Sequence, residues 1–470
     1  KLVPLFCYKI RIMSFSVVVL AAGQGSRMSS NKPKALQTLA GKPMLSHILL
    51  EIEKIKPKQT IVVHSPEHRD LIKNAVTNFS RTKLVKQKHP LGTGDALKTA
   101  TPNLDKENNI LVLLGDVPMI KAKTLKRLQE GVVDVDILVL TTKLEKPKGY
   151  GRIKRDKQNN VMAIVEEAEC NKEEKEINEI NSGIIAFSRE HLDELLSGLD
   201  ASNKKGEYYL TDTIEKAHNR GLKVDTVITN SSEVFGVNNK KDLAEAERLM
   251  RAEITDALME QGVTICDPTR IDIRGNLKCG KDVYIDVNTI FEGDVELSDG
   301  VTVRPFVSIA NSIVGENTEI KAYSTIDKSK IGSDCTIGPY ARLRPGSELR
   351  SESRVGNFVE IKKSTIGERS KVPHLSYVGD TTVGVDSNIG AGTITCNYDG
   401  ANKHKTKIGD NVFIGSGVEL VAPVLIDDDS TIGAGSTISK STPKGELTLE
   451  RSKQKTVKGW QRPTKSKDKK

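Results

Sequence analysis

The chain has 470 residues, of which 37% are hydrophobic and 28% charged, with a formal net charge of +9. This length exceeds one ordinary hydrophobic core, so we expect two domains and a connector. No apolar run approaches the roughly 20 residues that cross a bilayer, which argues against a membrane-spanning protein. Residues 1–12 carry +3 and residues 452–470 carry +7, so the body of the chain is close to neutral and does not indicate a nucleic-acid-binding surface.

The two ends of the chain are expected to lie outside the folded domains. Residues 1–13 hold a short apolar stretch that Pro4 interrupts and that no cleavage site follows, so we interpret them as a disordered or spurious extension with a suspected start at Met13. The segment 452–470 is interpreted as a solvated basic tail, and a role near an anionic ligand stays open. The six cysteines show no C-x-x-C spacing, which disfavours a zinc site or a disulfide framework and favours a cytoplasmic protein.

Residues 14–238 alternate short β-rich runs with helical stretches. Buried strands are expected at Ser16–Leu20, Thr60–His64, Asn109–Leu114 and Val135–Thr141. This alternation predicts an α/β domain with a mostly parallel sheet.

Two of these strands end in segments that can carry chemistry. The first leads into AAGQGSRM (21–28), a loop of small residues whose backbone N–H groups can face a phosphate, with Arg27 and Lys34 as cations. Glycines alone would equally serve a tight turn. The strand Asn109–Leu114 is followed by Gly115 and Asp116, and a carboxylate in this position is a usual Mg²⁺ ligand in an open α/β sheet. Such an Asp is often only a cap, but beside the glycine loop we favour the ligand.

The periodicity changes twice in the second half. Over Asn239–Gln261 apolar residues recur at three- and four-residue steps, which predicts a long helix. Beyond Gly262 aliphatic residues recur every six residues, as at Ile331, Ile337, Leu343, Leu349, Val355 and Ile361 and again at Ile408, Ile414, Leu420, Ile426, Ile432 and Ile438. A three-sided coil with six residues per side places all of these inside, so we predict stacked coils of a β-helix. The stretch Thr395–Lys407 breaks the count and is predicted to leave the coil as a loop.

Further segments match known motifs. They are Gln87 with Leu91-Gly92-Thr93-Gly94, Gly149-Tyr150-Gly151-Arg152-Ile153, Glu166, Asn181-Ser182-Gly183, Gly236-Val237-Asn238-Asn239 and Pro373-His374-Leu375-Ser376-Tyr377-Val378-Gly379-Asp380. The glycine loop resembles the signature of sugar-1-phosphate nucleotidyltransferases. With these segments, residues 14–451 resemble the bacterial family of bifunctional UDP-N-acetylglucosamine pyrophosphorylases/glucosamine-1-phosphate N-acetyltransferases.

The resemblance implies a two-part fold and two reactions. The fold would be an α/β domain of the nucleotide-diphospho-sugar transferase type at 14–238, a helical linker at 239–261 and a left-handed parallel β-helix of hexapeptide repeats at 262–451. The β-helix would acetylate glucosamine-1-phosphate with acetyl-CoA. The α/β domain would then join N-acetylglucosamine-1-phosphate to UTP with Mg²⁺ and release pyrophosphate, making UDP-N-acetylglucosamine for peptidoglycan and lipopolysaccharide.

The same resemblance assigns residues to the nucleotidyl-transfer site. UTP and the sugar nucleotide would contact Leu20, Ala21, Ala22, Gly23, Lys34, Gln87, Gly92, Thr93, Gly151, Glu166, Asn181 and Asn238. Mg²⁺ would be held by Asp116 and Asn238, with Arg27 as the catalytic residue. The family usually has a lysine two residues after the glutamate, where this chain has Ala168.

Acetyl transfer to an amine needs a base, and His374 is the candidate. By the resemblance, glucosamine-1-phosphate would contact Arg344, Lys362, Tyr377 and Asn388. Acetyl-CoA would contact Asn397, Tyr398, Ser416, Ala434 and Arg451.

Two other functions remain open at this point. One is a single-activity sugar-1-phosphate nucleotidyltransferase whose β-helix is only structural, and the other is a nucleotide-sensing scaffold without turnover. The segment around His374 argues against the first, and the joint presence of Arg27, Lys34, Asp116 and Asn238 argues against the second. The resemblance also implies a homotrimer that acts on small molecules, with no nucleic acid and no membrane as partner.

Overall fold

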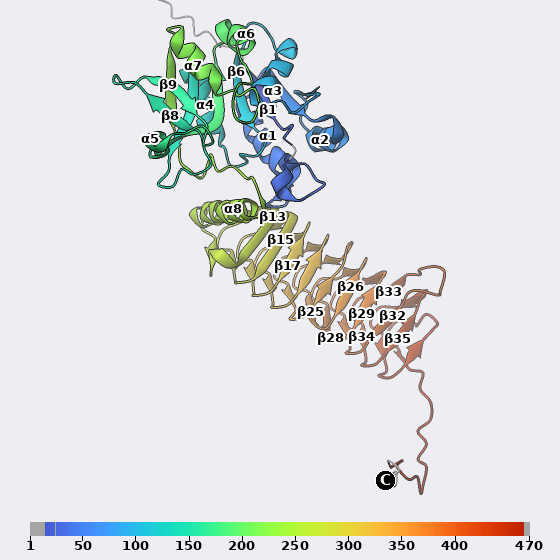
Figure 1. The fold of residues 1–470 in the computed structure, drawn as a ribbon. Helices are drawn as coiled ribbons and strands as arrows, with labels where there is room; N and C mark the ends of the chain where they lie inside the picture. Colours follow the sequence, from blue (N-terminus) through green and yellow to red (C-terminus); the bar gives the residue numbers. More distant parts are fainter. Residues whose placement is uncertain (1–14, 24, 465–470) are drawn as a thin grey trace, which may run out of the picture. The chain divides into compact units, whose positions relative to one another are not determined.

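The computed structural model describes residues 15–23 and 25–464 (Figure 1). The chain divides into two compact units, the N-terminal unit up to Ala252 and the C-terminal unit from Glu253 onward. The predicted extension 1–13 lies outside the described residues, as do residues 465–470 of the predicted tail. The described tail residues, 452–464, are exposed and form no helix or strand. The predicted domain limits stay predictions, and the observed division falls inside one helix.

That helix is α8 (Lys240–Glu260), which confirms the helix predicted over Asn239–Gln261. Its apolar residues Ala246, Met250 and Leu258 are buried, as the three- and four-residue spacing requires. No helix in the described ranges is long and apolar enough to cross a membrane.

Among the described residues, the N-terminal unit holds a nine-stranded sheet whose main path runs β11-β7-β10-β6-β1-β4-β5. The strands are β1 (Phe15–Leu20), β4 (Gln59–His64), β5 (Thr82–Lys86), β6 (Asn109–Leu114), β7 (Ile137–Lys143), β10 (Glu179–Phe187) and β11 (Val224–Ile228), with β8 (Arg152–Arg155) and β9 (Val161–Val165) off the path. The four predicted strands are confirmed as β1, β4, β6 and β7. β7 begins two residues later than predicted, because residues 134–136 form a bend after the preceding helix. β10 runs antiparallel to β6 and β7, so the sheet is mostly parallel but mixed.

Helices cover both faces of this sheet, and alternate residues of β1 show why. Val17 and Val19 pack into one buried cluster, whereas Val18 packs into the other, because successive strand residues point to opposite faces. The first cluster includes residues of α1, α2 and α4, and the second includes residues of α3, α6 and α7. The helices are α1 (Met44–Lys54), α2 (Arg69–Val76), α3 (Thr93–Ala100), α4 (Ala122–Gly131), α5 (Lys172–Lys175), α6 (Arg189–Ser197) and α7 (Asp212–Asn219).

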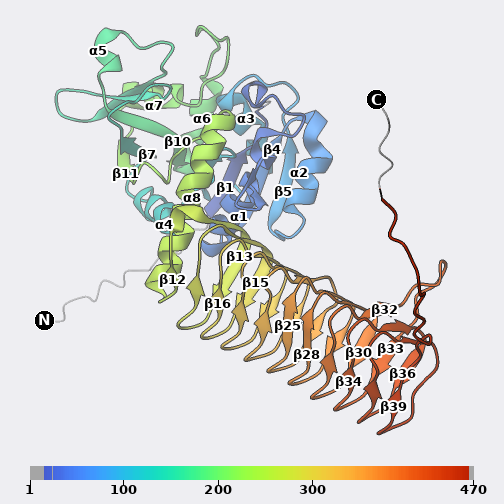
Figure 2. The ribbon, with the colours of Figure 1, turned by 90° about the horizontal axis from the view of Figure 1, so that it is seen from below.

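The C-terminal unit is a stack of three-sided coils with parallel pairing between coils (Figure 2). Its first side runs from β12 (Thr264–Ile265) to β39 (Leu447–Thr448) and includes β25 (Arg354–Asn357), β28 (Lys371–His374), β31 (Asn388–Ile389), β34 (Phe413–Ile414) and β37 (Thr431–Ile432). The second side includes β23 (Arg342–Leu343), β26 (Glu360–Lys362), β29 (Tyr377–Gly379), β32 (Ile394–Cys396), β35 (Glu419–Val421) and β38 (Thr437–Ile438). The third includes β27 (Thr365–Ile366), β30 (Thr381–Val383), β33 (Thr406–Ile408) and β36 (Val424–Ile426).

The six-residue period is confirmed as a column of inward-facing aliphatic side chains. Each of the twelve residues named for the period is at most 5% exposed. A second inward column, which the sequence pattern did not reveal, consists of small hydroxyl side chains near the corners. Ser364, Ser370 and Ser376 donate to the carbonyl oxygens of Val378, Gly384 and Gly390 in the following coil. These bonds join successive coils at points where the backbone turns.

The predicted loop Thr395–Lys407 is shorter than expected. Thr395 and Thr406 are buried within β32 and β33, so they belong to the coil. The loop proper is 397–405, which contains an isolated bridge between Tyr398 and Lys403. The six-residue repeat is interrupted by the insertion. The residues at its two ends nevertheless pair in parallel with the neighbouring coils.

Removing the same atoms from an inside and an outside position tests the packing of the column. Ile326 is fully buried and Ile313 is 48% exposed. Ile326→Ala should lower the free energy of unfolding of the β-helix by about 2–5 kcal/mol, because it leaves a cavity among packed side chains. Ile313→Ala should cost under about 1 kcal/mol. Guanidinium-induced unfolding, followed at the transition of the β-helix, measures both losses of stability. Equal losses would contradict the assignment of Ile326 to an inside position and Ile313 to an outside position.

Candidate functional sites

In the N-terminal unit, parallel pairing brings the glycine loop beside Asp116. Leu20 pairs with Leu114, and the Gly115 amide donates to the Leu20 carbonyl oxygen at 2.9 Å. The segments that follow β1 and β6 therefore leave the sheet at the same edge. They border a cavity of about 260 Å³ lined by Leu20, Ala21, Gly23, Gly25, Arg27, Lys34, Ala35, Gly115, Asp116 and Asn238.

Two positions shape this loop. Gly25 has a φ of +62°, and a Cβ there would lie 2.8 Å from Cβ of Lys34, so glycine lets the loop approach the lysine. Ala22 was predicted to contact the nucleotide, but it is buried in the core cluster that contains Val18 and does not line the cavity. The loop thus offers Leu20, Ala21 and Gly23 to a ligand.

Two side-chain oxygens converge on one ammonium group in this cavity. Lys34 Nζ forms an ion pair with Asp116 and lies 2.8 Å from Asn238 Oδ1. The Val237 amide donates to the Asp116 carbonyl oxygen, which holds the Asn238 segment against the end of β6. Carboxylate and amide oxygens are the ligands that Mg²⁺ prefers, so this pair fits the predicted metal. Within the described ranges no group of three or more His, Cys, Asp or Glu could hold a metal ion.

A second cavity, of about 190 Å³, adjoins the first. Both are lined by Asp116 and Asn238. The second is also lined by Thr93, Leu114, Gly149, Tyr150, Gly151, Glu166, Asn181, Ser182, Gly183, Ile185, Leu210, Thr211 and Gly236. The predicted sugar segments therefore come together beside the predicted metal ligands.

Glu166 is a half-buried carboxylate that lines this second cavity. Its Oε1 accepts a hydrogen bond from Thr211 Oγ1 at 3.0 Å. Burial raises the pKa of Glu166, and the hydrogen bond from Thr211 partly opposes that rise. Thr211 was not predicted, and no pattern in its segment marks it as a site residue. The carboxylate and the threonine oxygen can together accept hydrogen bonds from a polyhydroxylated ligand.

Gln87 has a supporting position. Its side chain is buried, and Nε2 donates to the carbonyl oxygen of Gly92 and to Asp95 Oδ2. Gly92 has a φ of +112°, and a Cβ there would lie 2.6 Å from the Tyr208 carbonyl oxygen. Gln87 lines neither cavity, so in this arrangement it fixes the turn that presents Thr93.

In the β-helix, His374 lies exposed at the end of β28. Its Nδ1 is hydrogen-bonded to Oδ1 of Asn357, the residue paired with it in the preceding coil. Because an amide oxygen accepts, Nδ1 is the donor in this bond, and in a neutral ring the lone pair is then on Nε2. Asn357 was not predicted, although it lies one coil before His374, a spacing of 17 residues.

The predicted acetyl-CoA residues Ser416 and Ala434 lie on the same edge of the coil stack as His374. Ile389, Ile414 and Ile432 pair in register, and residues two positions later form the edge. Along it the Gly417 amide donates to Ala391 O, and the Gly435 amide donates to Ser416 O. Ser416, Ala434 and Arg451 are all exposed. An extended ligand could therefore lie along this edge from the histidine toward the tail.

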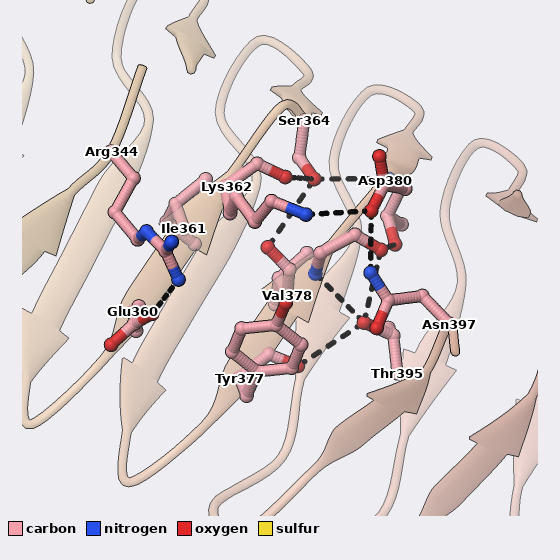
Figure 3. Close-up of polar contacts among 12 residues, drawn as sticks. Arg344, Glu360, Ile361, Lys362, Ser364, Tyr377, Val378, Asp380, Thr395 and Asn397 are labelled. Atoms are coloured by element: carbon pink, nitrogen blue, oxygen red, sulfur yellow. Dashed lines mark hydrogen bonds and ion pairs between the residues drawn. The ribbon is translucent and has the colours of Figure 1, made fainter. Parts of the chain in front are cut away.

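The second side of the coil stack carries a charged network next to this edge (Figure 3). Lys362, which is 9% exposed, lies 3.2 Å from Asp380 Oδ2, and Asn397 Nδ2 donates to the same oxygen. Arg344 pairs with Glu360 at 2.7 Å one coil earlier. Asp380 and Glu360 thus hold the cations in place.

Lys403 lies close to Lys362 in this network. The closeness of Lys362 lowers the pKa of Lys403, because two ammonium groups held close together repel each other. Lys403 was not predicted; it belongs to the loop 397–405.

A Cβ on Gly379 would lie 2.5 Å from the Tyr377 hydroxyl, so glycine leaves room for the tyrosine ring. The exposed Tyr398 donates to the Gly400 carbonyl oxygen within the loop, and Asn388 is half-buried on β31.

Comparisons with known proteins agree with two catalytic parts. Residues 17–204 match the family described as MobA-like NTP transferase domain, and residues 405–440 match the bacterial transferase hexapeptide family of six repeats. The chain is 48% identical over 453 residues to the bifunctional protein GlmU of Chromobacterium violaceum, covering 96% of this chain and 99% of that protein. It is 47% identical to the protein of the same name from Nitrosomonas europaea, covering 97% of this chain and 100% of that one. The Marinobacter nauticus protein is 46% identical, covering 96% and 99%.

The raised pKa of Glu166 predicts a pH-dependent stability. The pKa of Glu166 in the folded chain lies above its ordinary value of 4.5, so its charge disfavours the folded state above the folded pKa and has no such effect below 4.5. Glu166→Gln should therefore raise the melting temperature of the N-terminal unit at pH 7.5, with a smaller gain at pH 5.

Glu174→Gln is the matched control with the opposite sign. Its hydrogen bond from Lys154 lowers the pKa of Glu174, so loss of the charge should lower stability at pH 7.5. Differential scanning calorimetry of both variants measures this. A Glu166→Gln variant that melts lower at pH 7.5 than the parent would show that the charge of Glu166 does not disfavour the folded state.

Proposed function

The chain belongs to the family of bifunctional GlmU proteins, transferases with uridylyltransferase and acetyltransferase activities, and from this membership we propose how its residues divide the two reactions. The N-terminal unit joins N-acetylglucosamine-1-phosphate to the uridylyl group of UTP. The β-helix acetylates glucosamine-1-phosphate with acetyl-CoA. The proposal rests on one arrangement in each unit. In the N-terminal unit the glycine loop lies beside the side-chain oxygens of Asp116 and Asn238, and in the β-helix Asn357 orients His374.

In the first reaction the glycine loop binds the triphosphate. The loop that follows β1 faces its oxygens, and Arg27 and Lys34 offset their charge. Asp116 and Asn238 would hold Mg²⁺, which when bound neutralises charge on the phosphate oxygens. Lys34, now paired with Asp116, is then free to pair with a phosphate.

The sugar phosphate occupies the adjoining cavity. Glu166 accepts a hydrogen bond from a sugar hydroxyl, while Gly151, Thr93 and Asn181 border the ring. Its phosphate oxygen, placed near Asp116, attacks the α-phosphorus of UTP in line and pyrophosphate leaves. Positioning and charge neutralisation carry such a transfer, so no covalent residue is required.

In the second reaction His374 takes a proton from the amine of glucosamine-1-phosphate. Asn357 holds Nδ1, so Nε2 accepts that proton. Lys362, Arg344 and the unpredicted Lys403 bind the sugar phosphate, with Tyr377 and Asn388 beside the sugar. Acetyl-CoA lies along the edge formed by Ser416, Ala434 and Arg451, and Asn397 and Tyr398 contact its acetyl group.

The family membership also supports a homotrimer in the cytoplasm, where UTP and acetyl-CoA are available. A single-activity enzyme is disfavoured, because a structural β-helix has no need of His374 oriented by Asn357 or of Lys362 held by Asp380. A non-catalytic scaffold is disfavoured by the convergence of Asp116 and Asn238 on one point.

A split assay on two variants tests the division of labour. His374→Ala should lower acetyl transfer by about 10²–10⁴-fold, because it removes the base, and should leave pyrophosphate release unchanged. Asp116→Ala should abolish uridylyl transfer and leave acetyl transfer intact. Thiol release from acetyl-CoA and pyrophosphate release are measured separately. Loss of both activities in either variant would refute separate sites.

Asn357 provides a second test within the β-helix. Asn357→Ala removes the partner that fixes the imidazole, so acetyl transfer should fall by roughly 10–100-fold. Asn357→Asp keeps an acceptor for Nδ1–H and should restore part of the rate, with a pH–rate profile shifted to higher pH because an adjacent carboxylate favours the protonated imidazole. Steady-state rates from pH 6 to 9 measure this. Unchanged rates and profiles in both variants would show that Asn357 does not orient His374.

A further inference from the structure

One charged side chain of the N-terminal unit is buried without a role in the proposed chemistry. Arg152, at the start of β8, is 2% exposed and is among the largest fully buried side chains of the described residues. It lines neither the nucleotide cavity nor the sugar cavity. A buried guanidinium is costly unless it is paired and hydrogen-bonded, so its partners need an explanation.

The partners of Arg152 belong to the walls of the sugar cavity. Its Nη1 donates to the Tyr150 carbonyl oxygen, two residues back in the segment Gly149–Gly151. Its Nη2 lies 2.7 Å from Glu167 Oε2, although the two atoms do not have hydrogen-bond geometry, so the contact is an ion pair. Nε has no partner among the described residues. Glu167 follows Glu166 directly in the chain.

The backbone of Arg152 also lies between the strands that carry the other sugar-cavity residues. Arg152 pairs with Val165 of β9 on one side and with Ile180 of β10 on the other. The Asn181 amide donates to the Gly151 carbonyl oxygen at 2.8 Å. One residue is thus in contact, through backbone or side chain, with all three segments that present Gly151, Glu166 and Asn181.

We infer that the ion pair between the buried Arg152 and the partly exposed Glu167 is a positioning element for the sugar phosphate in uridylyl transfer. Glu167 cannot shift without moving Glu166, and Tyr150 cannot shift without moving Gly151, because the residues are covalent neighbours. The guanidinium joins the two segments across the cavity wall, so it fixes the separation between them. This inference rests on the proposed function, in which that cavity holds the sugar phosphate.

The effect should appear in the binding of one substrate. The nucleotide cavity is lined by residues that Arg152 does not contact, so UTP binding should not depend on the pair. Loss of a fixed charged contact should raise the KM for N-acetylglucosamine-1-phosphate roughly 10-fold. The kcat at saturating sugar phosphate should change by no more than about threefold, because the reacting groups themselves stay in place.

The experiment uses the full chain with conservative variants that keep the buried volume. Arg152→Lys keeps the charge but loses the two-pronged contact, and Glu167→Gln keeps the shape but loses the charge. Lys154→Gln is the matched control, since Lys154 lies two residues along the same strand and pairs with Glu174 at 2.9 Å. KM for N-acetylglucosamine-1-phosphate, KM for UTP and acetyl transfer are measured for each variant. The acetyl-transfer rate reports whether the rest of the chain is folded.

The inference predicts a raised KM for the sugar phosphate in Arg152→Lys and Glu167→Gln, with KM for UTP, acetyl transfer and the Lys154→Gln control unchanged. Equal rises in both KM values, or no rise, would overturn it. Asn181→Ala separates its failure from that of the proposed function. If Asn181→Ala raises the KM for the sugar phosphate and Arg152→Lys does not, the cavity assignment stands and the positioning role is wrong. If Asn181→Ala has no effect either, the sugar cavity itself is wrongly assigned, and the inference falls with it.

Discussion

Parallel strand pairing in strict register is the constraint on which both sites depend. In the N-terminal unit, Leu20 of β1 pairs with Leu114 of β6, so the glycine loop and Asp116 follow these strands at the same edge of the sheet. In the β-helix, His374 lies one coil after Asn357 and on the same edge as Ser416 and Ala434. In each unit, residues far apart in the sequence meet because parallel strands bring equivalent positions to one edge. Parallel pairing thus has the same effect in both units, although most strands of the β-helix are shorter than those of the sheet.

The cations that are proposed to bind substrate phosphates are paired with carboxylates in this structure. Lys34 is paired with Asp116, Lys362 with Asp380, and Arg344 with Glu360. Each pair offsets part of the cost of partly burying a charge. Each cation is then held close to the place where a substrate phosphate is proposed to bind. Phosphate binding would exchange one anionic partner for another, which requires less reorganisation than ordering a free lysine or arginine.

Local patterns were sufficient to predict much of the fold. The six-residue repeat determines which aliphatics face inside, since only one period fits a three-sided coil, and the four strands of the first half were found from their apolar runs. The ends of the predicted loop 395–407 were wrong, because Thr395 and Thr406 are polar yet buried in the ladder. The six-residue repeat does not predict that small hydroxyl side chains can be buried inside the coils. They are buried where backbone carbonyl oxygens of the coils accept their hydrogen bonds.

Asp116, Lys34 and His374 were predicted as site residues from motifs, and their roles stay predictions. Asp380 and Arg152 lie within quoted motif segments but were given no role, and Asn357 was not predicted, because the contacts of each depend on a partner in another strand. A usable signal exists in the β-helix: the spacing of 17 or 18 residues between coils relates 357 to 374 and 362 to 380. No such spacing relates Arg152 to Glu167 across a hairpin. Ala22 and Gln87 were predicted from motif matches; both side chains are buried, and their contact with a nucleotide stays a prediction.

Each unit is proposed to bind its own pair of substrates at an edge made by parallel pairing. A crystal structure of the full chain with UTP, Mg²⁺ and coenzyme A is the decisive experiment. We expect triphosphate density against Leu20–Gly23 and Asp116, and coenzyme A density along the edge from His374 to Ala434. Triphosphate bound elsewhere in the chain, or coenzyme A lying on another side of the coils, would contradict this proposal.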